Sequence, residues 1–171
     1  HLADSEAGIR VDTTIGGLSL SGIYYYGFDR DGVYYRSDNS IHHPRIDRFG
    51  YALDYGTSIF GQRLIIRSEG LYTSGKSFNT SDPFAIGGIV KKDVLKLALA
   101  FETSVGSAEN KVDILYQPQW THQLGYDART GAVRNDLLHV ISLSHSVRAT
   151  SDKLSLGATF YVNAGGSSFG G

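Results

Sequence analysis

Residues 94–105 read Val-Leu-Lys-Leu-Ala-Leu-Ala-Phe-Glu-Thr-Ser-Val, and this stretch decides the fold. Large apolar residues alternate in it with charged or small ones: Leu95, Leu97, Leu99 and Phe101 against Lys96, Ala98, Ala100 and Glu102. Successive side chains of a β-strand point to opposite faces of the sheet. The stretch therefore predicts a strand with one apolar and one polar face.

Seven further segments outside this stretch alternate in the same way. The predicted strands cover residues 8–15, 18–28, 46–56, 62–73, 94–105, 111–122, 135–148 and 153–163. Short turns at residues 16–17, 57–61, 106–110 and 150–152 alternate with long loops at residues 29–44, at residues 74–93 and around Asp127, Thr130 and Gly131. Gly, Asn, Asp and Ser recur in these connections because they tolerate or stabilise turn conformations. Strict alternation of short and long connections is typical of a bacterial outer-membrane β-barrel.

The predicted fold class is all-β: an antiparallel transmembrane β-barrel with about eight strands in this chain. The alternative is a soluble sheet or sandwich, whose strands alternate too. Most of the predicted strands are near the ~9–11 residues that a tilted span requires. Aromatic residues gather near strand ends, as in interfacial girdles; they are Tyr24, Tyr25, Tyr26, Phe28, Tyr34, Tyr35, Tyr72, Trp120, Tyr126, Phe160 and Tyr161. No run approaches the ~20 apolar residues of a membrane helix.

Composition sets the broad limits on function. The 171 residues suit one domain, so residues 1–171 are assigned to a single barrel domain or barrel segment. The chain has no cysteine, which excludes disulfides, thiol nucleophiles and thiolate metal sites. The formal net charge of −1 lacks the basic excess expected of a nucleic-acid-binding protein.

The last residues, 165–171, are rich in glycine and finish with Gly170-Gly171 rather than with the aromatic residue that commonly closes the last strand of such barrels. The expectation is that the chain is a portion of a larger barrel. A complete eight-stranded barrel with a Gly-rich tail is the alternative, and its length would suit that too.

Charged and polar residues inside the strands form the best candidate site. The predicted pore-lining residues are Arg10, Asp12, Arg48, Asp54, Arg63, Arg67, Glu69, Lys96, Glu102, Asp113, Gln117 and Arg148, with Lys153 a further charge of the same kind. Such side chains would set the ion or solute preference of a pore. The alternative is that they pair across strands and fill the interior of a narrow barrel.

Two other groups of residues contain side chains that could act as catalysts or metal ligands. His139, Ser142, Ser144, His145 and Ser146 offer Ser–His pairs, but His139 and Ser142 have opposite parity in a strand, as do Ser144 and His145, so no catalytic residue is predicted. His42 and His43 beside Asp38 lack a complete metal-ligand set. The loop that holds Tyr34, Tyr35, Arg36 and Asp38 could instead form a recognition surface or a constriction.

Several short motifs resemble a Gram-negative outer-membrane family, domain of unknown function 1302. They are Gly8-Ile9-Arg10-Val11-Asp12, Ile15-Gly16-Gly17-Leu18-Ser19-Leu20-Ser21, Tyr24-Tyr25-Tyr26-Gly27-Phe28-Asp29, Arg63-Leu64-Ile65-Ile66-Arg67-Ser68-Glu69-Gly70-Leu71-Tyr72, and the region of Gln117 and Gln119. Members of that family are much longer, so this chain would be an internal portion. The resemblance implies a porin-like or export-related barrel that works with a periplasmic lipoprotein and an inner-membrane transporter.

The sequence supports three hypotheses for the function of this chain. The first is an integral outer-membrane barrel of a Gram-negative envelope, in contact with its lipids, that lets solutes pass. The second is a structural barrel that anchors a partner protein or presents loops without an open pore. The third, an enzyme in a barrel wall, is set aside; no cofactor or metal is predicted, and the chain is not expected to be an enzyme.

Overall fold

The chain folds into one antiparallel sheet of eight strands with a separate small hairpin. The computed structural model describes residues 5–107, 110–126, 129, 136–149 and 152–163, and in its last two strands the side chains of residues 136–137, 145–149, 152–157, 159 and 161–163 are not described. The strands are β1 (Ala7–Ile15), β2 (Leu18–Phe28), β5 (Arg45–Ile59), β6 (Gln62–Asn79), β7 (Ile89–Gly106), β8 (Asn110–Gln123), β9 (Asp136–Ala149) and β10 (Asp152–Asn163). They lie side by side in this order, each paired with the next along the chain.

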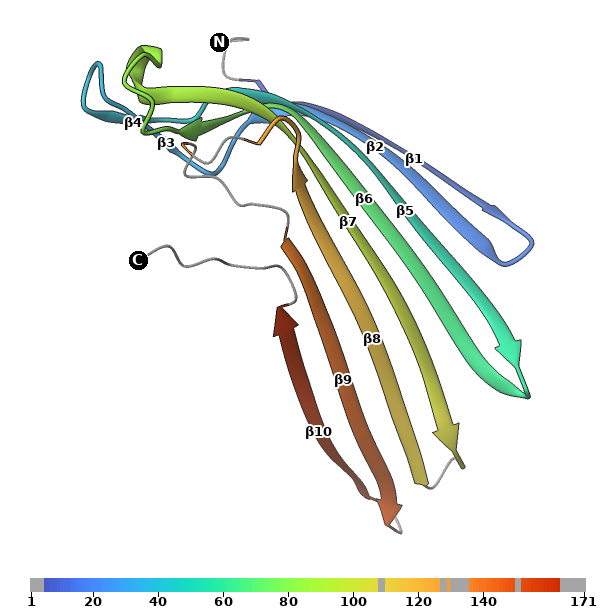
Figure 1. Ribbon diagram of the computed structural model, residues 1–171. Coiled ribbons are helices and arrows are strands. Elements are labelled where there is room, and N and C mark those ends of the chain that lie inside the picture. The colour runs from blue at the N-terminus through green and yellow to red at the C-terminus, as the bar shows by residue number, and fades with distance from the viewer. Residues whose placement is uncertain (1–4, 108–109, 127–128, 130–135, 150–151, 164–171) are drawn as a thin grey trace.

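The sheet is a curved, open wall with β1 at one edge and β10 at the other (Figure 1). The all-β antiparallel prediction is therefore confirmed for the described residues, but these residues do not close into a barrel. Among the described residues, no helix is long and apolar enough to cross a membrane.

The short connections lie at one end of the sheet and the long ones at the other (Figure 1). The β1–β2 turn places Gly16 and Gly17 at φ of 55° and 86°, and the β5–β6 turn places Phe60 and Gly61 at 51° and 75°. Two consecutive residues with positive φ fit the two-residue turns that join antiparallel strands. The second turn was predicted over residues 57–61. It is shorter, because the ladder between β5 and β6 continues to the pair Ile59 and Gln62.

The long-loop end is more ordered than the sequence predicted. The first long loop contains a hairpin of β3 (Val33–Tyr35) and β4 (Ser40–His42). The second long loop, predicted over residues 74–93, is shorter: β6 extends into it as far as Asn79, β7 begins at Ile89, and a short 3-10 turn lies at Ile86–Gly88. A bulge shifts the β6–β7 register between Thr73 and Lys76, where Gly75 has a φ of 64°. This bulge interrupts the two-residue period, which is why the sequence pattern predicts a strand end at residue 73.

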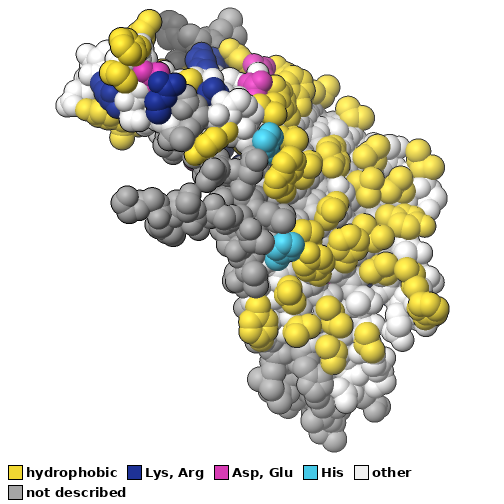
Figure 2. Space-filling model, in the orientation of Figure 1, with side chains coloured by type: hydrophobic (Ala, Val, Ile, Leu, Met, Phe, Trp, Pro, Cys, Tyr) yellow, Lys and Arg dark blue, Asp and Glu magenta, His cyan; other side chains and the backbone are white. Residues whose placement is uncertain are grey.

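Register divides the sheet residues into two faces. Residues directly opposite one another in a ladder share a face, and one such row runs Asp12, Ser21, Ala52, Glu69, Ala98 and Gln119. We call the side of the sheet that carries this row the polar face and the opposite side, which carries Leu97 and Phe101, the apolar face. Figure 2 looks onto the apolar face: hydrophobic side chains spread over the sheet, and the charged ones gather toward the long-loop end.

Buried hydrophobic side chains lie on the polar face or in the loop that covers it, not on the apolar face. Ile46, Val94 and Val140 belong to polar-face rows, and Val33 belongs to the β3–β4 hairpin. The apolar face instead leaves large side chains exposed, among them Ile9, Val11, Ile15, Leu20, Phe49, Ile59, Leu99, Phe101, Val105, Leu143 and Phe160. This is the reverse of a soluble sandwich, which buries its apolar face.

Candidate functional site

The predicted pore-lining residues all occupy polar-face positions of the ladders. The rows Arg10–Ile23, Ser19–Asp54–Arg67–Ala100 and Ile65–Glu102–Leu115 connect several of them across the sheet. Register places the others on the same face: Arg48, Arg63, Glu69, Lys96, Asp113, Gln117 and Arg148. Arg148 and Lys153 are opposite one another in the β9–β10 ladder, but their side chains lie outside the described residues.

Several of these residues form ion pairs, some across strands and some within one strand. Arg67 reaches Asp54 through Nε and Glu102 through Nη1, both at 2.9 Å, so that one guanidinium links three strands. Near the β1 edge Arg10 pairs with Asp12 at 2.8 Å, and the Ser21 hydroxyl also donates to Asp12. At the short-turn end Asp113 pairs with Lys111 at 2.6 Å and accepts a hydrogen bond from Ser104. These pairs are largely exposed, so each stabilises the fold only weakly.

The polar face is hollowed along the strands. A hollow of about 680 Å³ is lined from β1 to β8 by residues that include Arg10, Asp54, Glu69 and Lys96. A smaller one of about 220 Å³ lies beside Arg67, Glu69 and Gln117. A third, of about 420 Å³, lies at the long-loop end under Asp31, Gly32 and Val33. Seven of the predicted residues therefore line these hollows: Arg10, Arg48, Asp54, Arg67, Glu69, Lys96 and Gln117.

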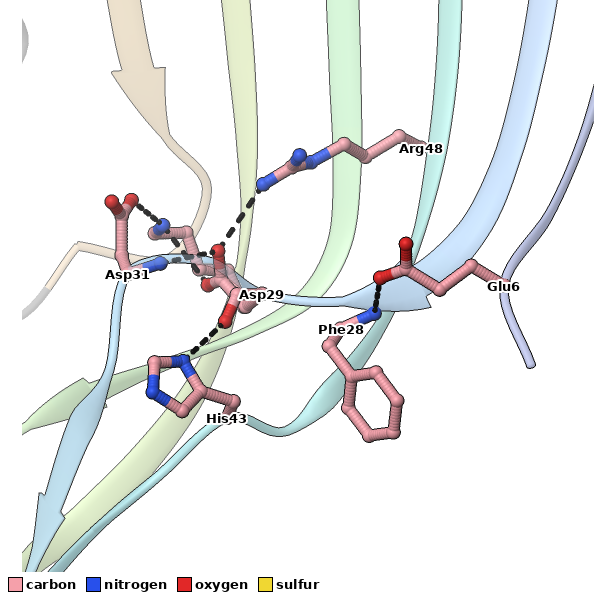
Figure 3. A network of polar contacts seen from close by, with 7 residues as sticks. Glu6, Phe28, Asp29, Asp31, His43 and Arg48 are labelled. Carbon is pink, nitrogen blue, oxygen red and sulfur yellow. Dashed lines mark hydrogen bonds and ion pairs between the residues drawn. The ribbon is translucent and has the colours of Figure 1, made fainter. Parts of the chain in front are cut away.

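Asp29 connects the first long loop to the polar face through hydrogen bonds and ion pairs (Figure 3). Its side chain is 1% exposed and accepts hydrogen bonds from Arg48 at 3.1 Å and Lys76 at 3.0 Å. Its backbone N–H donates to the Pro44 carbonyl at 2.8 Å, and its carbonyl accepts a bond from His43 Nδ1 at 2.9 Å. A carboxylate this deeply buried is stable only with such partners. We call Asp29, Asp31, Arg48 and Lys76 the loop knot.

Three carboxylates outside the regular strands are shifted toward the charged form. The Lys76 ammonium, 2.5 Å from Asp31, lowers the pKa of the Asp31 carboxyl. The hydrogen bond from His42 at 2.6 Å lowers the pKa of Asp38. The Tyr25 hydroxyl and then the Phe28 backbone N–H lower the pKa of Glu6. In each case a donor favours the ionised carboxylate.

The long loops are connected to one another by hydrogen bonds. Tyr34 and Asn79 exchange two hydrogen bonds, and Arg36 donates from its backbone to Gly87 and from its side chain to Thr80 at 2.7 Å. From the third loop, the Arg129 carbonyl accepts bonds from Thr80 and Ser81. The first long loop therefore lies against the second and the second against the third, which forms a cap at this end of the sheet.

The loop knot was not predicted apart from Arg48. Asp29 follows strand β2 with no pattern that marks it as buried, and Lys76 lies after the bulge, beyond the predicted strand end. Gln123 and Ser77, which are buried in the same region, were missed as well. A strand prediction that allowed a bulge at Gly75 would have placed Lys76 on the polar face.

His42 and His139, which belong to the two groups not predicted to form a site, have hydrogen-bond partners in the structure. His42 binds Asp38 and the Ser40 hydroxyl and contacts the Tyr35 ring at a tilt of 45°, with ring centroids 4.3 Å apart. Among the described residues no group of three His, Cys, Asp or Glu side chains could hold a metal ion. His139 lies on the apolar face and accepts or donates a hydrogen bond with the Tyr116 hydroxyl at 2.8 Å. The side chains of His145 and Ser146 are outside the described residues.

Aromatic side chains form a row on the apolar face near the long-loop end. Tyr24, Phe49 and Tyr72 follow one another across β2, β5 and β6, with ring centroids 4.9 and 6.4 Å apart. The Tyr24 hydroxyl donates to Asp47 and that of Tyr72 to Asp93. Four predicted girdle members lie elsewhere: Tyr25 faces the polar side, Tyr34 and Tyr35 belong to the β3–β4 hairpin, and Tyr126 lies beyond the end of β8. The side chain of Tyr161 is not described.

Comparison of the chain with protein-family models, with curated proteins and with solved structures finds no match. The resemblance to the outer-membrane family thus stays a prediction.

Proposed function

We propose that this chain forms part of the wall of an outer-membrane β-barrel, and that its polar face lines a water-filled path for solutes. The observation that carries the proposal is the segregation of the two faces. Every predicted charged position lies on the hollowed polar face, whereas the opposite face exposes large hydrophobic side chains. Lipid tails would cover such a face, and water would solvate the other.

Three further features support a barrel wall. The row of Tyr24, Phe49 and Tyr72 on the apolar face combines apolar rings with the polar hydroxyl groups of its two tyrosines, and this combination suits a membrane interface. The strand ends that the short turns join lie at one end of the sheet, and those that the long loops join lie at the other. The edges at β1 and β10 leave room for further strands to complete a barrel. Partnership with a periplasmic lipoprotein remains a prediction from the resemblance alone.

Single-cysteine variants give a direct test, because the natural chain has no cysteine. Ala100 and Leu99 are neighbours on β7 that occupy opposite faces. In the full-length protein, in a planar bilayer, a charged thiol reagent should label Ala100→Cys and lower the conductance in discrete steps. Leu99→Cys should stay unlabelled in the bilayer and react only after unfolding. Equal labelling of both positions, with the protein in the soluble fraction, would remove the membrane proposal.

The second candidate function is an anchor barrel without an open pore. The loop knot favours it, because the first long loop lies over one end of the polar face. Thiol labelling that follows the predicted face pattern in a bilayer without any conductance would identify the anchor.

A further inference from the structure

Residues that line the cavity beneath the first long loop carry buried polar atoms without hydrogen-bond partners. Four buried side-chain atoms of the described residues make no hydrogen bond: Arg48 Nε, Ser77 Oγ, and Gln123 Nε2 and Oε1. All of them belong to residues that line the 420 Å³ cavity. Ser77 is 3% exposed and Gln123 2%. Buried polar groups ordinarily have a partner, so this concentration in one cavity points to a molecule that belongs there.

The floor of the cavity is built from two neighbouring rows of the sheet. One row runs Arg48, Thr73, Val94 and Gln123, and the next runs Leu71, Lys96 and Thr121. Asp31, Gly32 and Val33 of the first long loop lie over it, with Phe78 and Asn79 of β6 at the side. The loop knot holds this cover in place through Asp29.

The charges of the cavity favour an anion. Its lining includes three cations, Arg48, Lys76 and Lys96, against one acid, Asp31, and the buried Asp29 behind it offsets one more. Lys76 already bonds both of these carboxylates, at 3.0 and 2.5 Å. The donors left for a ligand are the Lys96 ammonium, Arg48 Nε and Gln123 Nε2. Cations and amide donors arranged in this way suit a carboxylate.

The remaining features define the rest of the ligand. Leu71, Phe78 and Val94 line the same cavity and would contact an apolar body. Gln123 Oε1 is an acceptor that a carboxylate cannot satisfy, so it calls for a donor such as a hydroxyl group. We propose that this cavity binds a small organic carboxylate with an apolar body and a hydroxyl group. The inference deepens the proposed solute path by naming the class of solute held at its loop end.

Binding is tested on the full-length protein in detergent micelles by calorimetry. The probe is 4-hydroxybenzoate, and its comparisons are the neutral 4-hydroxybenzamide and benzoate, which lacks the hydroxyl. We expect 4-hydroxybenzoate to bind about tenfold more tightly than the amide, since the ion pair is lost, and several-fold more tightly than benzoate. Equal binding of the acid and the amide, or binding of neither because water alone fills the cavity, would overturn the proposal. This comparison needs no variant.

Two lysines of β7 give a matched pair of variants. Lys96 lines the cavity, and Lys91 is exposed on the same strand and does not line it. Lys96→Gln should weaken binding of 4-hydroxybenzoate about tenfold and leave that of 4-hydroxybenzamide unchanged, while Lys91→Gln should change neither. An equal effect of both substitutions would contradict the proposed site.

The bilayer measurement separates this inference from the proposed function. Selective binding without any conductance would keep the carboxylate site and remove the pore. Conductance without selective binding would keep the pore and remove the site.

Discussion

Asp29 and Lys76 lie 47 residues apart in the chain, and an ion pair of 3.0 Å joins them where the first long loop meets the sheet. Loss of the Asp29 charge leaves the Lys76 and Arg48 cations without their buried partner. Removal of one member of a buried pair destabilises by about 3 kcal/mol. Asp29→Asn should therefore speed hydrogen exchange of the Tyr34 and Arg36 amides roughly a hundredfold.

Asp54→Asn is the matched control for this substitution. Its pair with Arg67 is half-exposed, so exchange in the loop should not change. Equal exchange rates in the two variants would show that the loop knot does not hold the first long loop.

Leu99 and Ala100 allow a test of which face meets lipid. An arginine at a lipid-facing position near the middle of the membrane destabilises a barrel by about 2–4 kcal/mol, whereas a water-facing one has little effect. Leu99→Arg should lower the free energy of unfolding in phospholipid vesicles by that amount, and Ala100→Arg by less than about 1 kcal/mol. The reverse order of the two variants would mean that the faces are assigned the wrong way round.

Arg67 should influence ion preference more than stability. Arg67→Gln removes one cation between Asp54 and Glu102 and leaves two carboxylates on the polar face. The reversal potential of the full-length protein in a salt gradient should shift toward cation preference, while stability falls by less than about 1 kcal/mol. Arg45→Gln, at a position on the opposite face, should leave the potential unchanged. An unchanged potential in both variants would place Arg67 outside the ion path.

Gly88 should be intolerant of a side chain. Its φ is +71°, and an added Cβ would lie 2.7 Å from the Arg36 side chain. Gly88→Ala should destabilise the cap by about 1–2 kcal/mol, read as faster exchange of the Arg36 amide. Gly22 has open space around its Cα, so Gly22→Ala should not weaken the cap. Equal exchange in the two variants would contradict the strain at Gly88.

Acid should loosen the cap. The pKa of Asp31 is lowered by Lys76 and that of Asp38 by His42, from an ordinary value of 3.8 in both cases. A carboxylate whose pKa is lower in the folded state stabilises it fully above the ordinary pKa, and this contribution is lost as the pH falls through the lowered value. Protection of the Arg36 amide, corrected for its intrinsic rate, should fall from about pH 4 downward. Asp31→Asn should reduce this pH dependence; the same acid response in the variant would exclude Asp31 as a cause.

Much of the sheet could be predicted because strand periodicity is local. In β7, alternation of Leu and Phe with Lys, Ala and Glu already separates the two faces, and the ladders keep that separation across strands. The predicted end of β6 at residue 73 was wrong because the bulge near Gly75 shifts the period by one residue. The β3–β4 hairpin was missed because each strand has only three residues, too few for a period to emerge.

Some residues of the candidate site could also be predicted from the sequence, and others could not. The charges on the polar face follow from parity alone, so Arg67, Glu69 and Lys96 could be named from the sequence. Ser77 and Gln123 could not, because their burial depends on a loop that arrives from more than forty residues away.

The sequence by itself determined that the chain forms long antiparallel strands with one apolar and one polar face, since side-chain alternation is a property of each strand. Only the tertiary structure decided that Asp29 is buried, that Lys76 and Arg48 meet it, and that a cavity with unpartnered polar atoms lies beneath the first long loop. Those features depend on the path of that loop over the sheet, which no local pattern of residues encodes.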